Sequence, residues 1–133
     1  MAGRNPSPTH VVKPSATSAD TRSRTIGRSV KQVSVLAVTT NTDDFITLPS
    51  LVSVPEGHQI TILCNAGGNF ELRTPVGSAE EINSEDSDGT NEYICTNTRR
   101  VIVTKISNTI GWEAHDYTAV GVATNGATPD YIL

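Results

Sequence analysis

Few residues in this chain of 133 residues have the types and spacing that catalytic or metal chemistry requires. The three histidines, His10, His58 and His115, lie far apart, and none has a partner at the spacing of metal ligands. His115 and Asp116 are adjacent, but successive strand residues point to opposite faces, so a regular strand cannot aim both at one ion. Each histidine is therefore interpreted as a surface or turn residue, and the sequence predicts neither a metal site nor a cofactor.

An acidic run that ends at Gly89 invites comparison with a calcium-binding loop. Aligning Gly89 with the invariant glycine of the EF-hand loop puts Ser84 at the first ligand position and Cys95 at the last, where the loop needs a bidentate glutamate. The template therefore fails at both ends. The run is interpreted as a solvated acidic loop, and a looser surface site at Asp86 and Asp88 is the alternative.

Motifs for nucleophilic or nucleotide chemistry do not occur in the chain. There is no nucleophile elbow, P-loop or dinucleotide fingerprint, and Gly67-Gly68 is followed by Asn69 in the setting of a hairpin. A glycosidase-type carboxylate pair can always be found among 14 acidic residues, and no pair stands out here. The sequence therefore predicts a protein that is not an enzyme.

Two cysteines, Cys64 and Cys95, each close an apolar, strand-like run of the sequence. They could be buried free thiols that pack as small hydrophobic residues in a reducing compartment, or they could pair across a sheet as a disulfide. The first interpretation is favoured.

Charge divides the chain into two parts. Residues 1–32 carry six basic residues against Asp20 alone, a net charge of +5, whereas residues 33–133 carry four basic residues against 13 acidic ones, a net charge of −9. A basic arm on an acidic body indicates that the arm has a partner of its own. The cations lack aromatic stacking platforms and the body repels a polyanion, so an acidic protein surface is favoured over nucleic acid.

Short β-rich runs begin at residue 33, and turn-forming residues interrupt them at close intervals. The predicted strands lie at 33–39, 45–48, 58–65, 69–74, 91–96, 100–106 and 112–120. No apolar stripe of helical period is sustained, so almost no helix is expected, and 78–84 forms one turn at most. No run approaches the roughly 18 apolar residues that span a bilayer, so no membrane segment is expected.

The predicted fold class is all-β, a small sandwich or barrel-like domain with an extended N-terminal arm. The arm, 1–32, is rich in Ser, Thr and Pro and shows no period, which is typical of a segment that is disordered or extended in isolation. The β domain covers 33–133 and ends in a short tail that either closes the sheet or docks on a neighbour.

One pattern is specific enough to compare with a known family. It consists of Asp44-Phe45-Ile46-Thr47-Leu48-Pro49, Gly57-His58-Gln59-Ile60-Thr61-Ile62, Asn65, Gly67, Pro75, Gly77 and Ile82-Asn83, with Trp112 near the end of the domain. This pattern resembles a β module of tailed-bacteriophage virion proteins, found in small capsid decoration (cement) proteins and in head or tail fibre pieces. The similarity covers about 33–120 and says nothing about the arm.

The resemblance implies a structural virion protein that assembles in the host cytoplasm and sits on the capsid surface. A homotrimer would bind the major capsid protein outside a phage head and stabilise the capsomer junctions. The arm would run along the capsid, where its candidate capsid-binding residues are Arg22, Arg24, Arg28 and Lys31. The alternative is a head or tail fibre or receptor-binding module whose acidic loops, or the region of Trp112, contact a host glycan.

Overall fold

Alternating burial along the longest strands separates an inner face from an outer face. In β4 (Gln59–Leu63) Ile60 and Ile62 are buried, and in β9 (Arg100–Ser107) Val101 and Val103 are buried, with more accessible residues between them. A period of two is what a half-buried strand requires. The computed structural model describes residues 9–12, 25–35, 44–65, 67–89, 91–118 and 130–131, of which 9–12 and 130–131 are described by their backbone alone.

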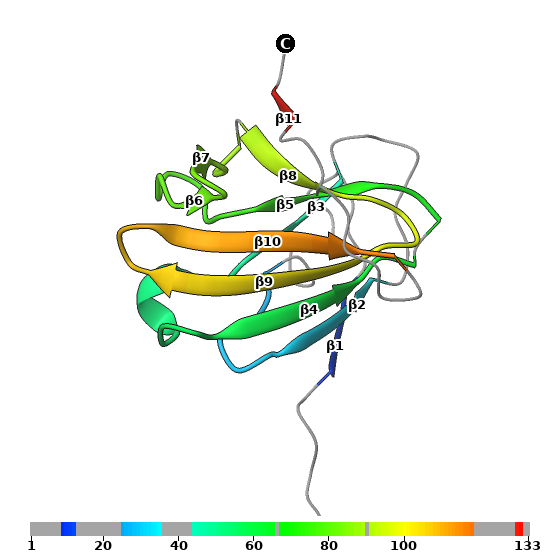
Figure 1. Cartoon of the computed structure of the whole chain (residues 1–133), viewed down its shortest axis with the longest axis horizontal. Helices are drawn as coiled ribbons and strands as arrows, with labels where there is room; N and C mark the ends of the chain where they lie inside the picture. The colour runs from blue at the N-terminus through cyan, green and yellow to red at the C-terminus, as the bar shows by residue number, and fades with distance from the viewer. Residues whose placement is uncertain are drawn as a thin grey trace, which may run out of the picture.

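The described strands form two sheets (Figure 1). The larger sheet has seven strands, in the order β1 (Thr9–Val12), β2 (Gln32–Val35), β4, β9, β10 (Gly111–Tyr117), β6 (Glu81–Ile82) and β7 (Glu85–Asp86). The smaller sheet has four strands, in the order β11 (Asp130–Tyr131), β8 (Asn91–Cys95), β5 (Phe70–Arg73) and β3 (Phe45–Thr47). The all-β prediction is therefore confirmed.

Pairing is mixed in both sheets. β9 pairs antiparallel with both β4 and β10, which places these three long strands at the centre of the larger sheet. β2 pairs parallel with β1 and β4, β3 pairs parallel with β5, and β10 pairs parallel with β6. Parallel pairs need crossover connections, and the chain supplies them by passing repeatedly from one sheet to the other.

Each of the seven predicted strands overlaps an observed strand, namely β2, β3, β4, β5, β8, β9 and β10. The ends of two predictions, at 36–39 and 119–120, lie outside the described residues. The sequence did not predict β1, β6, β7 or β11, nor the short 3-10 helix η2 (Leu51–Ser53). The stretch 78–84, for which the sequence predicts one helical turn at most, instead contains β6. A two-residue turn with positive φ at Asn83 and Ser84 connects β6 to β7.

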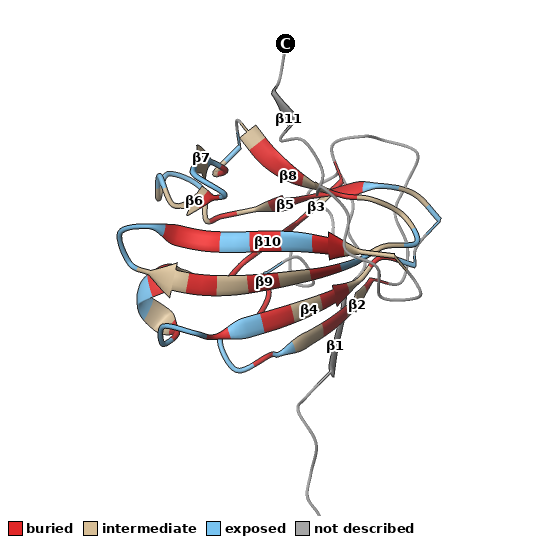
Figure 2. Cartoon of the chain, in the orientation of Figure 1, coloured by how far each residue is buried: buried red, intermediate tan, exposed pale blue. Residues whose placement is uncertain are grey.

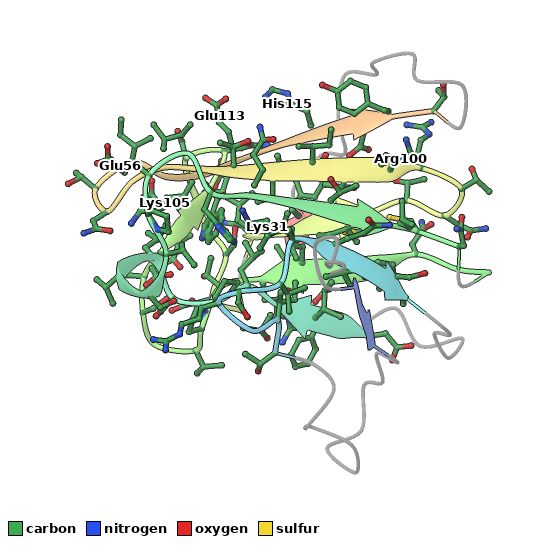
Figure 3. All side chains as sticks on the ribbon, turned by 90° about the horizontal axis from the view of Figure 1, so that it is seen from below. Lys31, Glu56, Arg100, Lys105, Glu113 and His115 are labelled. Atoms are coloured by element: carbon green, nitrogen blue, oxygen red, sulfur yellow. The ribbon has the colours of Figure 1, made fainter. Side chains whose placement is uncertain are left out.

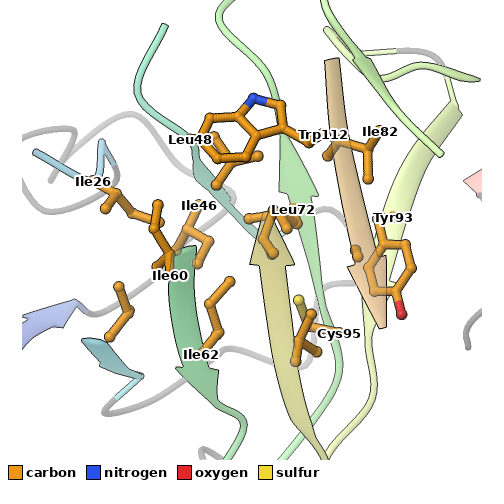
Figure 4. Packing of buried hydrophobic residues seen from close by; sticks show 14 of the residues in the cluster. Ile26, Ile46, Leu48, Ile60, Ile62, Leu72, Ile82, Tyr93, Cys95 and Trp112 are labelled. Atoms are coloured by element: carbon orange, nitrogen blue, oxygen red, sulfur yellow. The ribbon is translucent and has the colours of Figure 1, made fainter. Parts of the chain in front are cut away.

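The core lies between the inner faces of the two sheets (Figures 2 and 4). Trp112, Tyr93 and Phe70 are its largest apolar members and are at most 2% exposed. Aliphatic side chains from both sheets surround them, as expected for a chain with few aromatic residues. The main stabilising contribution of such a cluster is the burial of apolar surface, which is worth about 25 cal/mol per Å².

Part of the N-terminal arm belongs to this core, so packing does not follow the predicted boundary between residues 32 and 33. Ile26 is 1% exposed and Val30 is 8% exposed, and both are members of the hydrophobic cluster. The Ile26 backbone N–H donates to the Thr47 carbonyl at 2.8 Å. Farther upstream, β1 adds to the edge of the larger sheet beside β2. Residues 1–8 and 13–24 lie outside the described residues.

Candidate functional site

The structure describes two of the four predicted capsid-binding residues. Arg28 and Lys31 are exposed, on the segment that leads into β2, whereas Arg22 and Arg24 lie outside the described residues. Neither Arg28 nor Lys31 forms an ion pair with another residue in the described part of the chain. Both positive charges are therefore open to a partner.

The backbone that carries these two cations is fixed from both sides. Ile26 and Val30 are buried on either side of Arg28, and the Val30 N–H donates to the Gly27 carbonyl at 3.0 Å across the turn. The Lys31 carbonyl accepts a hydrogen bond from the Thr61 N–H at 2.9 Å. The side chains of Arg28 and Lys31 thus project from an anchored turn rather than from a free arm.

Lys31 also lines a hollow of about 450 Å³ between the start of β2, the loop before β4 and β4 itself. Glu56, His58, Gln59 and Thr61 contribute to its walls. A hollow with one lysine, one carboxylate and several polar side chains suits a polar side chain of a partner protein.

His58 lies in the wall of this hollow and is 8% exposed, so of the predicted alternatives, a surface or a turn residue, it is the turn residue. Its backbone N–H closes the turn by donating to the Pro55 carbonyl at 3.1 Å. Its ring forms a hydrogen bond with the Val30 backbone, and its Nε2 atom is buried without a hydrogen-bond partner. Burial lowers the pKa of His58, the charge of Lys31 lowers this pKa further, and the bond to Val30 raises it. His58 is therefore neutral at pH 7, because its pKa lies below the ordinary 6.5.

His115 is exposed, as predicted, and its Nε2 atom lies 3.3 Å from Glu113 Oε1. His10 lies in β1, where only the backbone is described. In the acidic run, Asp88 Oδ2 accepts from the Ala79 N–H at 3.3 Å. Within the described ranges, no group of three or more potential ligands is placed to hold a metal ion.

Both cysteines are buried free thiols, as the favoured interpretation predicts. Cys64 follows β4 of the larger sheet and Cys95 ends β8 of the smaller sheet, so the two side chains meet between the sheets. Burial raises the pKa of Cys95 well above its usual range, and a hydrogen bond with Cys64 adds to this rise. A thiol held in its protonated form is a poor nucleophile, so the pair acts as core packing.

Two cations of the acidic body form internal contacts, Arg73 from a partly exposed position and Lys105 from a buried one. Arg73 Nη2 lies 2.6 Å from Glu71 Oε1 and 3.5 Å from Glu92 Oε1, and the guanidinium stacks on the Phe45 ring at 4.0 Å. Lys105 is 4% exposed. Sequence offers little signal for this, because a lone cation in a strand is read as an outward-facing residue.

Sequence reasoning also missed a second hollow, of about 240 Å³, lined by Arg99 and Arg100. Arg99 Nη1 lies 3.8 Å from Asp116 Oδ2, and the other carboxylate oxygen of Asp116, Oδ1, accepts a hydrogen bond from the Tyr93 hydroxyl. Burial raises the pKa of Asp116, while the Tyr93 bond and the charge of Arg99 lower it. The signal that could have revealed this site is an Arg-Arg pair directly after a turn in an otherwise acidic domain.

No family model, curated protein or solved structure matches this chain. None of the helices in the described ranges is long and apolar enough to cross a membrane.

Proposed function

We propose that this chain is a non-catalytic structural virion protein, a capsid decoration (cement) protein that binds the outside of a phage head as a trimer. The observation that supports this most is the anchored pair of exposed cations, Arg28 and Lys31, of which Lys31 lines the hollow of about 450 Å³. Two fixed positive charges next to a polar hollow form a docking point for an acidic protein surface such as that of a major capsid protein.

Energetic considerations support many weak contacts rather than one strong contact. An exposed ion pair contributes only about 0.2–1 kcal/mol, so Arg28 and Lys31 alone hold one copy weakly. In a trimer the same contacts occur three times, and the second and third form at a high effective concentration. Such a protein would stabilise capsomer junctions by bridging neighbouring capsid subunits.

The test replaces both cations with glutamine, in a variant that carries Arg28→Gln and Lys31→Gln, and measures co-sedimentation with heads that lack the protein. Occupancy should fall at least about tenfold in 150 mM salt, because the charge-assisted contacts are lost. The matched control carries Asn108→Asp and Thr109→Asp in the exposed turn between β9 and β10, which lowers the net charge by the same amount. Equal binding of the two variants would contradict the proposal.

A head or tail fibre or receptor-binding module is the second candidate function, and one observation favours it. Three large apolar side chains of the described chain are strongly exposed: Val52 at 79%, Val76 at 86% and Ile110 at 54%. Val52 lies in the short helix η2, Val76 between β5 and β6, and Ile110 in the turn between β9 and β10, and exposed apolar side chains of this kind suit contact with a receptor. Gold-labelled antibody on intact particles separates the two functions, since label confined to the tail tips would exclude decoration.

A further inference from the structure

The exposed positive charge of the acidic body is concentrated at one place. Of the four cations in 33–133, Arg73 pairs with buried Glu71, and Lys105 is buried with its Nζ atom bonded to two backbone carbonyls at 2.7 Å. The remaining two, Arg99 and Arg100, are adjacent and line the hollow of about 240 Å³. In a domain with a net charge of −9, this hollow is therefore the one described point of 33–133 that attracts an anion.

The two guanidinium groups are not equivalent. Arg99 is 33% exposed and already faces the Asp116 carboxylate at 3.8 Å, whereas Arg100 is exposed and has no ion pair with a described residue. The hollow therefore offers about one uncompensated positive charge together with the polar side chains of Asn65 and Thr98. This charge suits a single carboxylate better than a doubly charged phosphate.

The backbone around this hollow is held in place by the turn between β8 and β9. The Thr98 N–H donates to the Cys64 carbonyl at 2.7 Å, and the Cys64 N–H donates to the Arg99 carbonyl at 3.0 Å. Asn97 links the turn to the preceding loop through its N–H and its side-chain oxygen. Thr98 has a φ of 72°, a left-handed conformation that β-branched residues rarely adopt and that often occurs at binding sites.

Exposed acidic residues gather at the opposite end of the sandwich. β10 begins beside β6, where Trp112 pairs with Ile82, and it ends beside Arg100, which pairs with Tyr117. The six steps from the first to the last residue of β10, at about 3.3 Å each, separate the two ends by about 20 Å. Figure 3 shows Glu56 and Arg100 at opposite ends of the sandwich. Asp86 is exposed on β7, which lies at the same end as Glu56.

We propose that the Arg99–Arg100 hollow binds a carboxylate supplied by the β6–β7 end of a second copy of this chain, with Asp86 as the donor of that carboxylate. Two bodies of net charge −9 repel each other, so copies associate where the acidic end of one meets the basic hollow of the next. Such a contact joins two different patches, and contacts of this type form a ring where the rotation between copies closes and an open filament where it does not. The inference rests on the self-association in the proposed function and names its contact.

The test uses three variants of the full chain, Arg100→Glu, Asp86→Lys and the double variant that carries both, with molar mass measured by light scattering over a concentration series. Each single variant brings like charges together, so the dissociation constant of the oligomer should rise roughly tenfold or more. The double variant restores an opposite-charge pair at every contact and should return to wild-type association. Raising the salt concentration should weaken the wild-type and double-variant oligomers alike.

Glu113→Lys is the matched control, because it makes the same charge change as Asp86→Lys at an exposed residue on the outer face of β10. It should leave the dissociation constant within about twofold of the wild-type value. A synthetic peptide of residues 80–89 should compete and dissociate the oligomer, whereas acetate at the same carboxylate concentration should not. Competition by acetate would identify the hollow as a site for free carboxylates and would overturn the second copy as its partner.

Other outcomes overturn the inference directly. They are a wild-type chain that is monomeric at all concentrations, single variants that associate as the wild type does, and a double variant that fails to recover. Head binding is measured separately on the same samples. An oligomer that responds to Arg100→Glu but never binds heads would overturn the capsid function and leave this contact standing.

Discussion

Lys105 is a buried cation whose hydrogen bonds hold a loop rather than a ligand. Its Nζ atom donates to the carbonyls of Leu51 and Val54 at 2.7 Å each, and these residues belong to and follow η2. Glu80 accepts from the Leu51 N–H at 3.2 Å on the other side of the same turn. Burial raises the pKa of Glu80, while the Leu51 bond and the charge of Lys105 lower it. Lys105 and Glu80 together thus fix the loop that presents Val52.

Replacing Lys105 with methionine should therefore destabilise the domain by about 2–4 kcal/mol, because two buried carbonyls lose their donor. Urea unfolding followed by tryptophan fluorescence gives the free energy of unfolding, and Trp112 in the core supplies the signal. Lys31→Met is the matched control: Lys31 is exposed, so its loss should change stability by less than about 0.5 kcal/mol. A small effect of Lys105→Met on the free energy of unfolding would mean that the turn keeps its conformation without the hydrogen bonds from Lys105.

His58 gives the domain a pH dependence of known sign. Because its pKa is lower in the folded chain than in the unfolded chain, the unfolded state binds more protons just below pH 6.5. The contribution of neutral His58 to stability is present above pH 6.5 and is lost as the pH falls toward the lowered folded-state pKa. Glu80 and Asp116, whose pKa values are raised, act in the opposite sense at lower pH.

The contribution of His58 is isolated by comparing the wild type with His58→Gln at pH 7.5 and pH 5.5. The wild type should lose more stability than the variant over this interval, by up to about 1 kcal/mol, since one pKa unit corresponds to about 1.4 kcal/mol. Thermal unfolding at each pH provides the measurement. Parallel curves for the two proteins would show that His58 titrates as it does in the unfolded chain.

At the scale of elements, the strands that sequence predicts are those in which apolar and polar residues alternate long enough to be read. Ile60 and Ile62 in β4, and Val101 and Val103 in β9, make that period visible. β6 and β7 have two residues each, which is too short to show a period. The parallel partners of β2 and β3 depend on contacts between distant segments, and local patterns do not encode them.

The segment at 25–32 was assigned to the arm because its composition is polar and no period runs through it. Ile26 and Val30 are two apolar residues four positions apart, which is a weak signal in isolation. Their burial becomes evident only when the Ile26 N–H meets the Thr47 carbonyl and Thr25 bridges to Thr47. The same reasoning explains the candidate site, since proximity of Lys31 to His58 arises from the pairing of β2 with β4.

Truncation tests this assignment. A chain that starts at residue 33 loses two core side chains, each worth about 2–5 kcal/mol, against a total stability of about 5–15 kcal/mol for a typical domain. A chain that starts at residue 25 keeps both. Urea unfolding should therefore be cooperative for the chain that starts at 25 and largely lost for the one that starts at 33. Ile26→Ala in the full chain should cost about 2–4 kcal/mol, and equal stability of the two truncated chains would contradict the assignment.

For the whole molecule, composition divides the chain into a basic part and an acidic part, but the boundary between these parts is not the boundary of the packed core. Residues 1–32 are basic and 33–133 are acidic, yet β1 and the core residues Ile26 and Val30 come from the basic part. Within the acidic part, counting charges did not reveal that Lys105 is buried or that Arg73 is paired with buried Glu71. What a surface offers to a partner depends on which charges burial leaves outside, and that follows only from the fold.

The place of β9 in the larger sheet has a consequence during synthesis. β9 is the middle strand of seven, and β1, β2, β4, β6 and β7 all precede it in the chain. A ribosome adds about 5–20 residues per second, so β4 waits for some seconds, with the edge that later pairs with β9 open, before β9 emerges. Slow codons between residues 64 and 99 would prolong that wait and favour aggregation of nascent chains. Fast translation of this interval, or a chaperone that shields β4, should therefore raise the yield of native protein.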